Sequence, residues 1–258
     1  MDKKGYKVKS IKNSIKVLES FSVEKLSLNL TELTEKTNIN KTTLFRILSN
    51  LEESCYILKN VNTKKYQLGI KLFELGQLVQ REMIIRDISL PIMKGLSYLT
   101  KETIGLDIAI GEKRATIEKI ESSHVVRHTI ELGKLYPLYA GANSKILLAF
   151  SSEDKIKKIV WKDKLVAFTD KTITDPAKLE SNLFEIKKKG YAVSIGEIFN
   201  NSTAIAVPIL KNNKKAIAAL FISGPSERFD GEKISRIIKL LKNSANNISK
   251  KIGYSVIK

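Results

Sequence analysis

Two short segments decide the fold of this chain: Asn29-Leu-Thr-Glu32 and Asn40-Lys-Thr-Thr-Leu-Phe-Arg46-Ile-Leu-Ser-Asn50-Leu51. Asn29 and Asn40 are typical N-cap residues, and Glu32 stands three residues after the first cap, where a capping box places a carboxylate. Asn38 lies between the segments and suits the end of the first helix, because asparagine tolerates the left-handed conformation. The pattern predicts two short helices joined by a tight turn.

The second of these helices is amphipathic. Its apolar residues recur at the spacing of one buried helical face: Leu44, Ile47, Leu48 and Leu51. Its other face is polar and basic and consists of Lys41, Thr42, Thr43, Phe45 and Arg46. In the major groove, Lys and Arg bond guanine or phosphate, and Thr contacts bases or the thymine methyl group. We therefore predict a helix-turn-helix whose polar face approaches bases or nearby phosphates. A small helical bundle with a solvated polar face is the alternative.

Flanking segments complete the predicted domain. Upstream, a supporting helix is predicted from Ile11, Ile15, Leu18 and Phe21. Downstream, two strand patterns at 56–59 and 65–68 predict a β-hairpin with Lys64 and Lys65 at its polar tip. This hairpin has the character of the wing in a winged helix, so we expect its lysines to contact the DNA backbone or minor groove. Cys55 is expected to be a small buried residue beneath the wing.

Length and charge set broader bounds. The chain has 258 residues, 43% of them apolar, which suits two domains with real cores. Its net charge of +18 favours a polyanionic partner. The basic excess is spread over the chain, with 16 Lys and Arg against 9 Asp and Glu in residues 1–86, and 29 against 18 in residues 87–258. A lysine-rich proteome is therefore an alternative explanation of the charge.

The sequence contains no recognisable targeting or membrane segment. Its N-terminus is charged and lacks the apolar run of a signal peptide, and no stretch approaches about 18 apolar residues. The single cysteine excludes an intrachain disulfide. We expect a cytoplasmic protein with no membrane partner.

The remaining sequence mixes helix and strand patterns. A linker helix is predicted from Gly69 to about Arg86, and Pro91 is expected to open or kink the next helix. A hairpin is predicted around Gly111, and further strands at 128–132, 191–193, 204–209 and 216–222, the last two joined by Asn212-Asn213. Helices are predicted at 143–150, 153–161, 176–189 and 230–252. The lysine run before Gly190 suits the negative end of its helix better than a nucleic-acid site. The fold class is thus α+β, with domains at 1–68, 69–86 and 87–258.

Signals of catalysis are weak. His124 and His128 lack a third metal ligand. Ser152 and Lys155 have the spacing of a Ser-x-x-Lys nucleophile, but they suit a helix N-cap with first-turn carboxylates better. Glu197 has no identifiable partner as a general base. Because neither a Walker A loop nor Gly-x-Gly-x-x-Gly occurs, we expect no cofactor, no metal and no enzymatic activity.

Several motifs together resemble the IclR family of transcription regulators over nearly the whole chain. They begin with the reader segment from Leu28 to Leu48 and Tyr66-Gln-Leu-Gly69, and continue with Gly133–Ala149, Ile173-Thr-Asp-Pro176, Gly190–Glu197, Ala204–Pro208 and Ile222-Ser-Gly-Pro225. The resemblance implies a winged helix-turn-helix, a linker helix and an effector-binding domain related to GAF and PAS folds. It also implies a homodimer, or a dimer of dimers, on a near-palindromic operator in double-stranded DNA.

The chain departs from the family pattern in both domains. Asn40 and Phe45 stand where the family often has Pro and His or Tyr. Members that sense small carboxylates often carry polar groups at positions aligned with Ser194, Ala204, Phe221 and Ser223. Ala204 and Phe221 therefore make this pocket less polar.

We expect a small-molecule effector, an organic acid, between the sheet and the loop of Gly141, Ala142 and Asn143. Backbone N–H groups at the start of a helix accept anions. Ser194 and Ser223 would add hydrogen bonds, with apolar walls from Tyr136, Leu138, Ala204 and Phe221. Core filling by Ala204 and Phe221 is the local alternative. Two alternatives concern the whole chain: a ligand-binding or enzymatic α+β protein that dimerises through its N-terminal helices, and a nonspecific architectural DNA protein.

Overall fold

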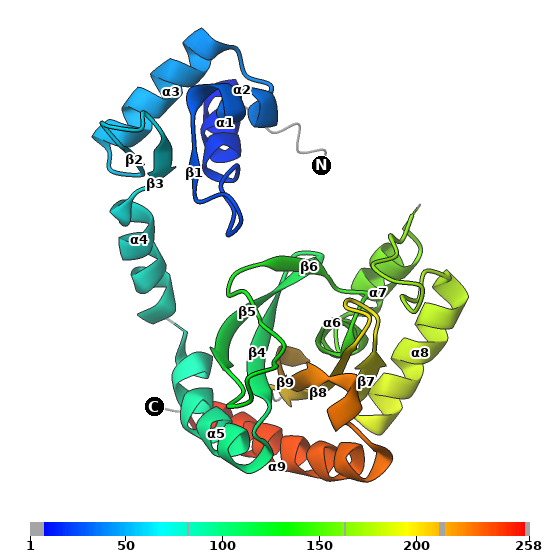
Figure 1. Cartoon of the computed structure of the whole chain (residues 1–258). Coiled ribbons are helices and arrows are strands. Elements are labelled where there is room, and N and C mark those ends of the chain that lie inside the picture. The colour runs from blue at the N-terminus through cyan, green and yellow to red at the C-terminus, as the bar shows by residue number, and fades with distance from the viewer. Residues whose placement is uncertain (1–7, 82, 163, 212–214, 256–258) are drawn as a thin grey trace. The chain divides into compact units, whose positions relative to one another are not determined.

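The computed structural model describes residues 8–81, 83–162, 164–211 and 215–255 (Figure 1). The chain divides into two compact units, Met1–Met83 and Ile84–Lys258. None of the described helices combines the length and apolar character needed to span a lipid bilayer.

The first unit is a winged helix-turn-helix. Its helices are α1 (Lys9–Leu18), α2 (Leu30–Thr37), α3 (Lys41–Glu53) and α4 (Ile70–Arg81). Its antiparallel sheet has the order β1-β3-β2, from β1 (Ser27–Leu28), β2 (Ile57–Lys59) and β3 (Tyr66–Leu68). Val17, Leu33, Leu44 and Leu48 are among the residues that form its buried core. The hairpin of β2 and β3 is the predicted wing.

The caps of α2 and α3 form as the sequence predicts. Asn29 accepts a hydrogen bond from the backbone of Glu32, and the Glu32 carboxylate accepts one from the Asn29 backbone, each at 2.9 Å. Asn38 ends α2 in the left-handed conformation, with φ of 53°. The Asn40 side chain accepts from the backbone N–H of Thr43 at 2.8 Å. Local hydrogen bonding thus defines both ends of the turn and confirms the capping box.

The predicted supporting helix forms as α1, and Leu18 and Phe21 pack against the core, although Ile11 and Ile15 are 60% and 49% exposed. Two expectations for this unit are wrong. Cys55 is exposed; it adopts a φ of 59° where the chain turns out of α3, and so it does not lie beneath the wing. The linker helix ends at Arg81, and Met83 lies outside any helix before α5 (Ile84–Thr100) begins.

The second unit is built on a six-stranded antiparallel sheet with the order β6-β5-β4-β9-β8-β7. Its strands are β4 (Thr103–Ile110), β5 (Lys113–Ile120), β6 (Leu135–Pro137), β7 (Ala192–Ile195), β8 (Ser202–Leu210) and β9 (Ala216–Pro225). Helices α5 and α9 (Gly231–Ser255) cover one face, and α6 (Ala142–Ala149), α7 (Glu153–Val160) and α8 (Pro176–Lys189) lie on the other (Figure 1). The fold class is the predicted α+β.

Strand alternation separates two hydrophobic cores. On β9, Leu220 and Ile222 pack with α5 and α9, whereas Ala219 and Phe221 face α6 and α8. The polar residue Ser223 continues the second set, because side chains two apart share a face of the sheet. The cavity described below lies on this second face.

One expectation for the second unit is wrong. Residues 128–132 form no strand, because the edge of β5 pairs with Leu135–Pro137 instead and leaves the preceding segment as a loop. Pro91, expected to open or kink its helix, lies inside α5, at the cost of one backbone hydrogen bond in that helix. Asn212 and Asn213, predicted to join β8 and β9, lie outside the described residues.

Candidate functional site

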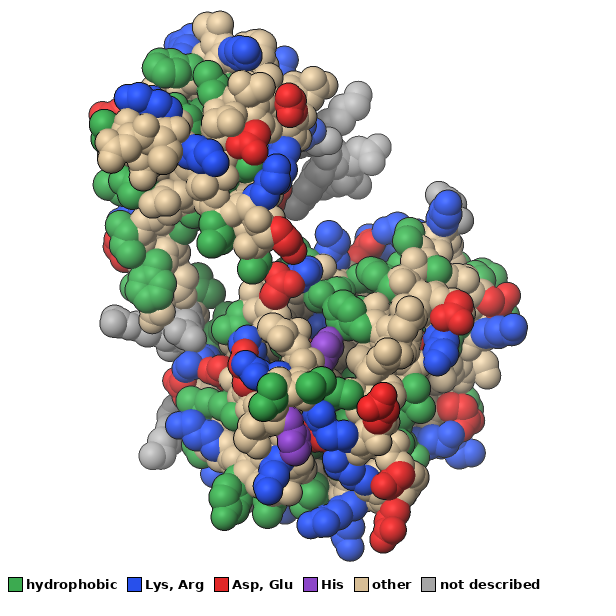
Figure 2. Space-filling view, viewed as in Figure 1, with side chains coloured by type: hydrophobic (Ala, Val, Ile, Leu, Met, Phe, Trp, Pro, Cys, Tyr) green, Lys and Arg blue, Asp and Glu red, His purple; other side chains and the backbone are tan. Residues whose placement is uncertain are grey.

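The outer face of α3 is accessible. Lys41, Thr42 and Arg46 are exposed, Phe45 is 52% exposed and Thr43 is partly buried. Since Leu44, Ile47 and Leu48 hold the opposite face in the core, the predicted reading residues are free of contacts that would hide them. Basic side chains are spread over the visible surface of this unit among apolar ones (Figure 2).

The wing tip has a defined conformation. The Asn60 side chain accepts hydrogen bonds from the backbone N–H groups of Asn62 and Thr63, at 3.0 and 2.9 Å. Lys64 follows with a φ of 57°, and its N–H donates to the Asn60 carbonyl at 2.9 Å. Lys64 and Lys65 are therefore presented as exposed side chains on an ordered turn.

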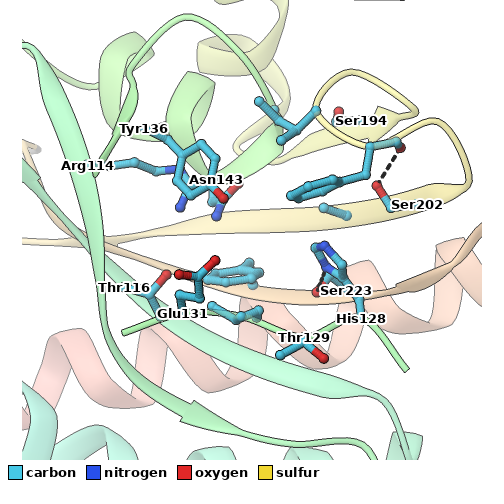
Figure 3. A pocket seen from close by; sticks show the side chains of 16 residues that line it. Arg114, Thr116, His128, Thr129, Glu131, Tyr136, Asn143, Ser194, Ser202 and Ser223 are labelled. Carbon is cyan, nitrogen blue, oxygen red and sulfur yellow. Dashed lines mark hydrogen bonds between the residues drawn. The ribbon is translucent and has the colours of Figure 1, made fainter. Parts of the chain in front are cut away.

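The second unit contains a small cavity between the sheet, the start of α6 and the loop that joins β5 to β6. Its volume is about 50 Å³, room for a few water molecules or a small ligand. Figure 3 shows Arg114, Tyr136 and Asn143 grouped together, and His128 beside Ser223. Residues from strands, helix and loops thus meet at one place although they are far apart in the chain.

Seven of the nine expected effector residues line this cavity: Tyr136, Gly141, Asn143, Ser194, Ala204, Phe221 and Ser223. The other two, Leu138 and Ala142, do not. Both are completely buried in the core between the sheet, α6 and α8, where apolar packing accounts for them.

Sequence reasoning missed the remaining lining residues, which include Arg114, Thr116, His128–Glu131 and Ile198, Phe199 and Ser202. Most belong to loops whose course depends on distant contacts. One signal was available: Asp107 is a carboxylate inside an apolar strand pattern. Its cross-strand partner is Thr116, so Asp107, Thr116 and Arg114 share one face of the hairpin.

The inner wall of the cavity is a buried polar network. The Arg114 guanidinium donates to Asp107 Oδ2 at 2.6 Å and to Ser144 Oγ at 2.7 Å. The Asn143 side chain donates to the same Asp107 oxygen at 2.6 Å. Asp107 is fully buried, so its charge depends on these partners. Arg114 also stacks against the Tyr136 ring, with 4.8 Å from guanidinium carbon to ring centroid.

A second buried pair fixes the start of α6. Lys145 is 1% exposed, and its ammonium donates to Glu197 Oε1 at 2.5 Å. The other Glu197 oxygen accepts from the N–H of Gly141 at 3.2 Å. Gly141 has a φ of 83°, and a Cβ there would lie 3.2 Å from Ile198. One of the backbone donors expected to hold an anion is therefore already bonded to a carboxylate of the protein.

His128 takes part in neither of these ion pairs. Its Nδ1 lies 3.2 Å from Ser223 Oγ, and its ring meets the edge of Phe199 with centroids 4.8 Å apart. Its Nε2 is buried and has no hydrogen-bond partner among the described residues. Burial, and to a smaller extent the positive charge of Arg114, lowers the pKa of His128 below its usual value. The ring is therefore neutral at pH 7.

Phe221 forms an apolar wall of the cavity and rests on Gly105. The two residues face each other across β4 and β9. A Cβ built on Gly105 would lie 2.2 Å from the tip of the Phe221 ring, so only glycine allows the ring to occupy this position. The depth of the cavity thus depends on a residue behind its wall.

The other residues considered as catalytic or nucleic-acid-binding candidates are exposed or take part in structural contacts. His124 is exposed, and the described residues hold no group of three or more His, Cys, Asp or Glu side chains suited to a metal ion. Ser152 occupies the N-cap position of α7 without a side-chain cap bond. Glu197 is engaged with Lys145. Lys187, Lys188 and Lys189 form the last turn of α8, with Gly190 as its C-cap.

A winged helix-turn-helix joined to a domain with a cavity of mixed polar and apolar lining is the architecture of a DNA-binding transcription regulator with a ligand-binding domain. Residues 10–59 match the IclR helix-turn-helix domain, and residues 77–250 match the bacterial transcriptional regulator IclR C-terminal domain. The chain belongs to the IclR family of transcription regulators.

Individual relatives match over nearly their full length. The chain is 33% identical to the HTH-type transcriptional regulator KipR of Bacillus subtilis (strain 168), over 96% of this chain and 99% of KipR. It is 32% identical to the HTH-type transcriptional regulator KdgR of Escherichia coli (strain K12), over 98% and 96% of the two chains. An IclR transcriptional regulator structure from Alicyclobacillus acidocaldarius superposes with a TM-score of 0.84 at 28% identity, over 95% and 99%. These relatives are regulators, not enzymes.

Proposed function

We propose that this chain is a sequence-specific DNA-binding regulator whose affinity for its operator is modulated by a small organic acid bound in the second unit. The observation that carries the proposal is the outer face of α3, where Lys41, Thr42 and Arg46 are exposed on a helix anchored from behind. A helix fixed in this way can present base-reading side chains without losing its own packing.

The residues have separate roles in this proposal. Thr42, Thr43 and Arg46 approach base edges near the start of α3, and Lys41 and Phe45 contact bases or the adjacent backbone. Lys64 and Lys65 on the wing hold phosphate or the minor groove. The cavity residues Tyr136, Asn143, Ser194 and Ser223 surround the effector, with Ala204 and Phe221 as apolar walls.

We also propose that the chain binds a near-palindromic operator as a homodimer or a dimer of dimers. Helix α4 exposes Ile70, Phe73, Leu78 and Val79, by 73%, 64%, 52% and 59%. Several large apolar side chains this exposed on one short helix suit an association site better than a free surface. Sedimentation measurements on the full chain and on Phe73→Ser test this proposal. A monomer at micromolar concentration in the unsubstituted chain contradicts it.

DNA binding is tested by fluorescence anisotropy on the chain's own upstream duplex and on a shuffled duplex at the same salt concentration. A preference of about a thousandfold is expected of a specific regulator. Equal binding to both duplexes would instead identify a nonspecific architectural protein.

Effector binding is tested by calorimetry with pyruvate, gluconate and 4-hydroxybenzoate as a small, a sugar and an aromatic acid. A binder should lose affinity in Ser194→Ala and Ser223→Ala, which line the cavity, and keep it in Ser123→Ala, an exposed serine outside the cavity. The same acid should change the anisotropy signal on operator DNA. A binder unaffected by both cavity substitutions would show that the effector site lies elsewhere.

A further inference from the structure

Among the described side chains that line the cavity, none carries an uncompensated positive charge with which to receive an acid. Of the ionisable side chains that line it, Arg114 is bonded to Asp107, and Glu131 is paired with Lys134. Lys145, at the start of α6, is bonded to Glu197. Since a buried carboxylate is strongly disfavoured without a partner, a cation in the cavity would bind an acidic ligand more firmly than the neutral donors alone.

His128 is the lining residue that can supply this charge. Its Nδ1 is already held by Ser223, which fixes the ring, and Phe199 packs against it. Its Nε2 is buried without a hydrogen-bond partner in the described part of the chain. His128 lines the cavity, and a ring nitrogen without a partner can accept a proton and then donate it to a ligand oxygen that comes within reach.

We propose that His128 binds the carboxylate of the effector as an imidazolium cation, so that each bound acid brings one proton into the cavity. The proposal rests on the proposed function, because it names the group that recognises the acid in that cavity. Nδ1–H of the imidazolium donates to Ser223 Oγ, and Nε2–H donates to the carboxylate. The proton comes from solvent or buffer, and the N–H bond that it forms with the ring is the only bond made.

The charged groups around the His128 ring determine how its pKa changes when an acid binds. From β5, Arg114 lowers the pKa of His128 together with burial. Glu131 in the same loop is neutralised by Lys134, and Tyr136 on β6 is the other titratable lining group. The β7, β8 and β9 side contributes hydroxyl and apolar groups. A ligand carboxylate beside Nε2 raises the pKa of the ring, so the free site is neutral and the filled site is charged at pH 7.

Proton uptake makes affinity depend on pH. Between the lower pKa of free His128 and the higher pKa of the bound form, affinity for the acid should rise about tenfold for each pH unit of acidification. Below the pKa of the free form, affinity should become constant because the ring is already protonated.

The experiment is calorimetry on the full chain with pyruvate, gluconate and 4-hydroxybenzoate, in buffers of equal pH, about 7.5, and different ionisation enthalpies. The expected result is uptake of close to one proton for each acid bound. His128→Gln keeps a side-chain amide but cannot titrate, and it should bind more weakly with no uptake. His124→Gln is the matched control, because the second histidine of the chain is exposed in the same loop and should leave uptake unchanged.

The outcomes separate this inference from the proposed function. An acid that binds the wild type without proton uptake, or with the same uptake in His128→Gln, overturns the role of His128 and leaves the effector site standing. If none of the three acids binds even at about pH 6 while specific DNA binding persists, the acid class and this inference both fail. If His128→Gln does not fold, NMR titration of the wild-type ring decides, because a bound acid must raise its pKa.

Discussion

The outer face of α3, proposed to read DNA, and the cavity proposed to hold the effector are built in opposite ways. The α3 face comes from five neighbouring residues, mostly exposed and held from behind by apolar packing. The cavity is assembled from β5, β6, β7, β8, β9, α6 and the loops between them, with Arg114 and the neighbouring Lys145 held in buried ion pairs. Side chains on α3 can therefore change with little effect on folding, whereas the buried pairs beside the cavity also stabilise the fold. Four substitutions test this difference.

The largest effect is expected behind the cavity. Lys145→Met leaves Glu197 buried without its cation and should lower the free energy of unfolding of the second unit by about 3–5 kcal/mol. Denaturant unfolding followed by Trp161 fluorescence measures this, because the single tryptophan lies in that unit. Lys158→Met is the control, since it removes an exposed pair with Glu112 and should cost less than about 1 kcal/mol. Equal losses of stability in the two variants would mean that the buried pair contributes no more to the fold than an exposed pair.

The next effect is expected on α3. Arg46→Ala should weaken binding to the specific duplex by about 1–3 kcal/mol and relax sequence preference, if the guanidinium bonds a guanine. Stability should be unchanged because Arg46 is exposed. Anisotropy on specific and shuffled duplexes measures both affinities, with Arg236→Ala on α9 as the control. A parallel loss on both duplexes would assign Arg46 to the phosphate backbone.

A smaller effect is expected at the capping box of α2. Asn29→Ala removes the capping box of α2 and should cost about 1 kcal/mol, which amide hydrogen exchange in α2 would report. Asn50→Ala on the exposed side of α3 should cost nothing, because alanine is the better helix former there. Unchanged exchange in Asn29→Ala would mean that packing alone orders the turn.

The smallest effect is expected on the wing. Lys64→Ala should weaken binding to all duplexes alike and lower the slope of log affinity against log salt by about one. The control is Lys188→Ala in the exposed lysine run of α8, which should leave the slope unchanged. A lower slope in the control would mean that α8 also contacts DNA.

The parts of the fold that the sequence predicted are those determined by local interactions. Asn29, Glu32, Asn38 and Asn40 act on backbone groups within four residues, so their positions alone predicted α2, the turn and α3. The segment 128–132 failed for the opposite reason. Its strand-like pattern was overridden because β5 pairs with Leu135–Pro137, a choice that depends on the whole sheet.

Prediction of the cavity residues from the sequence was limited in the same way. Its expected residues came from motif positions on α6 and the strands, and seven of nine lie along the wall. His128 and Phe199 could not be found this way, because they reach the cavity from loops and not from the motif positions. Leu138 and Ala142 were misplaced since a residue beside the cavity in sequence can point into the core behind it.

The contact between Gly105 and Phe221 has an evolutionary consequence. An alanine at position 105, one base change away from any glycine codon, would push the Phe221 ring from its resting place and into a cavity of about 50 Å³. If the cavity holds the effector, its selectivity for ligand size can change through a codon whose residue does not line the cavity, and position 105 is where to look for such a change.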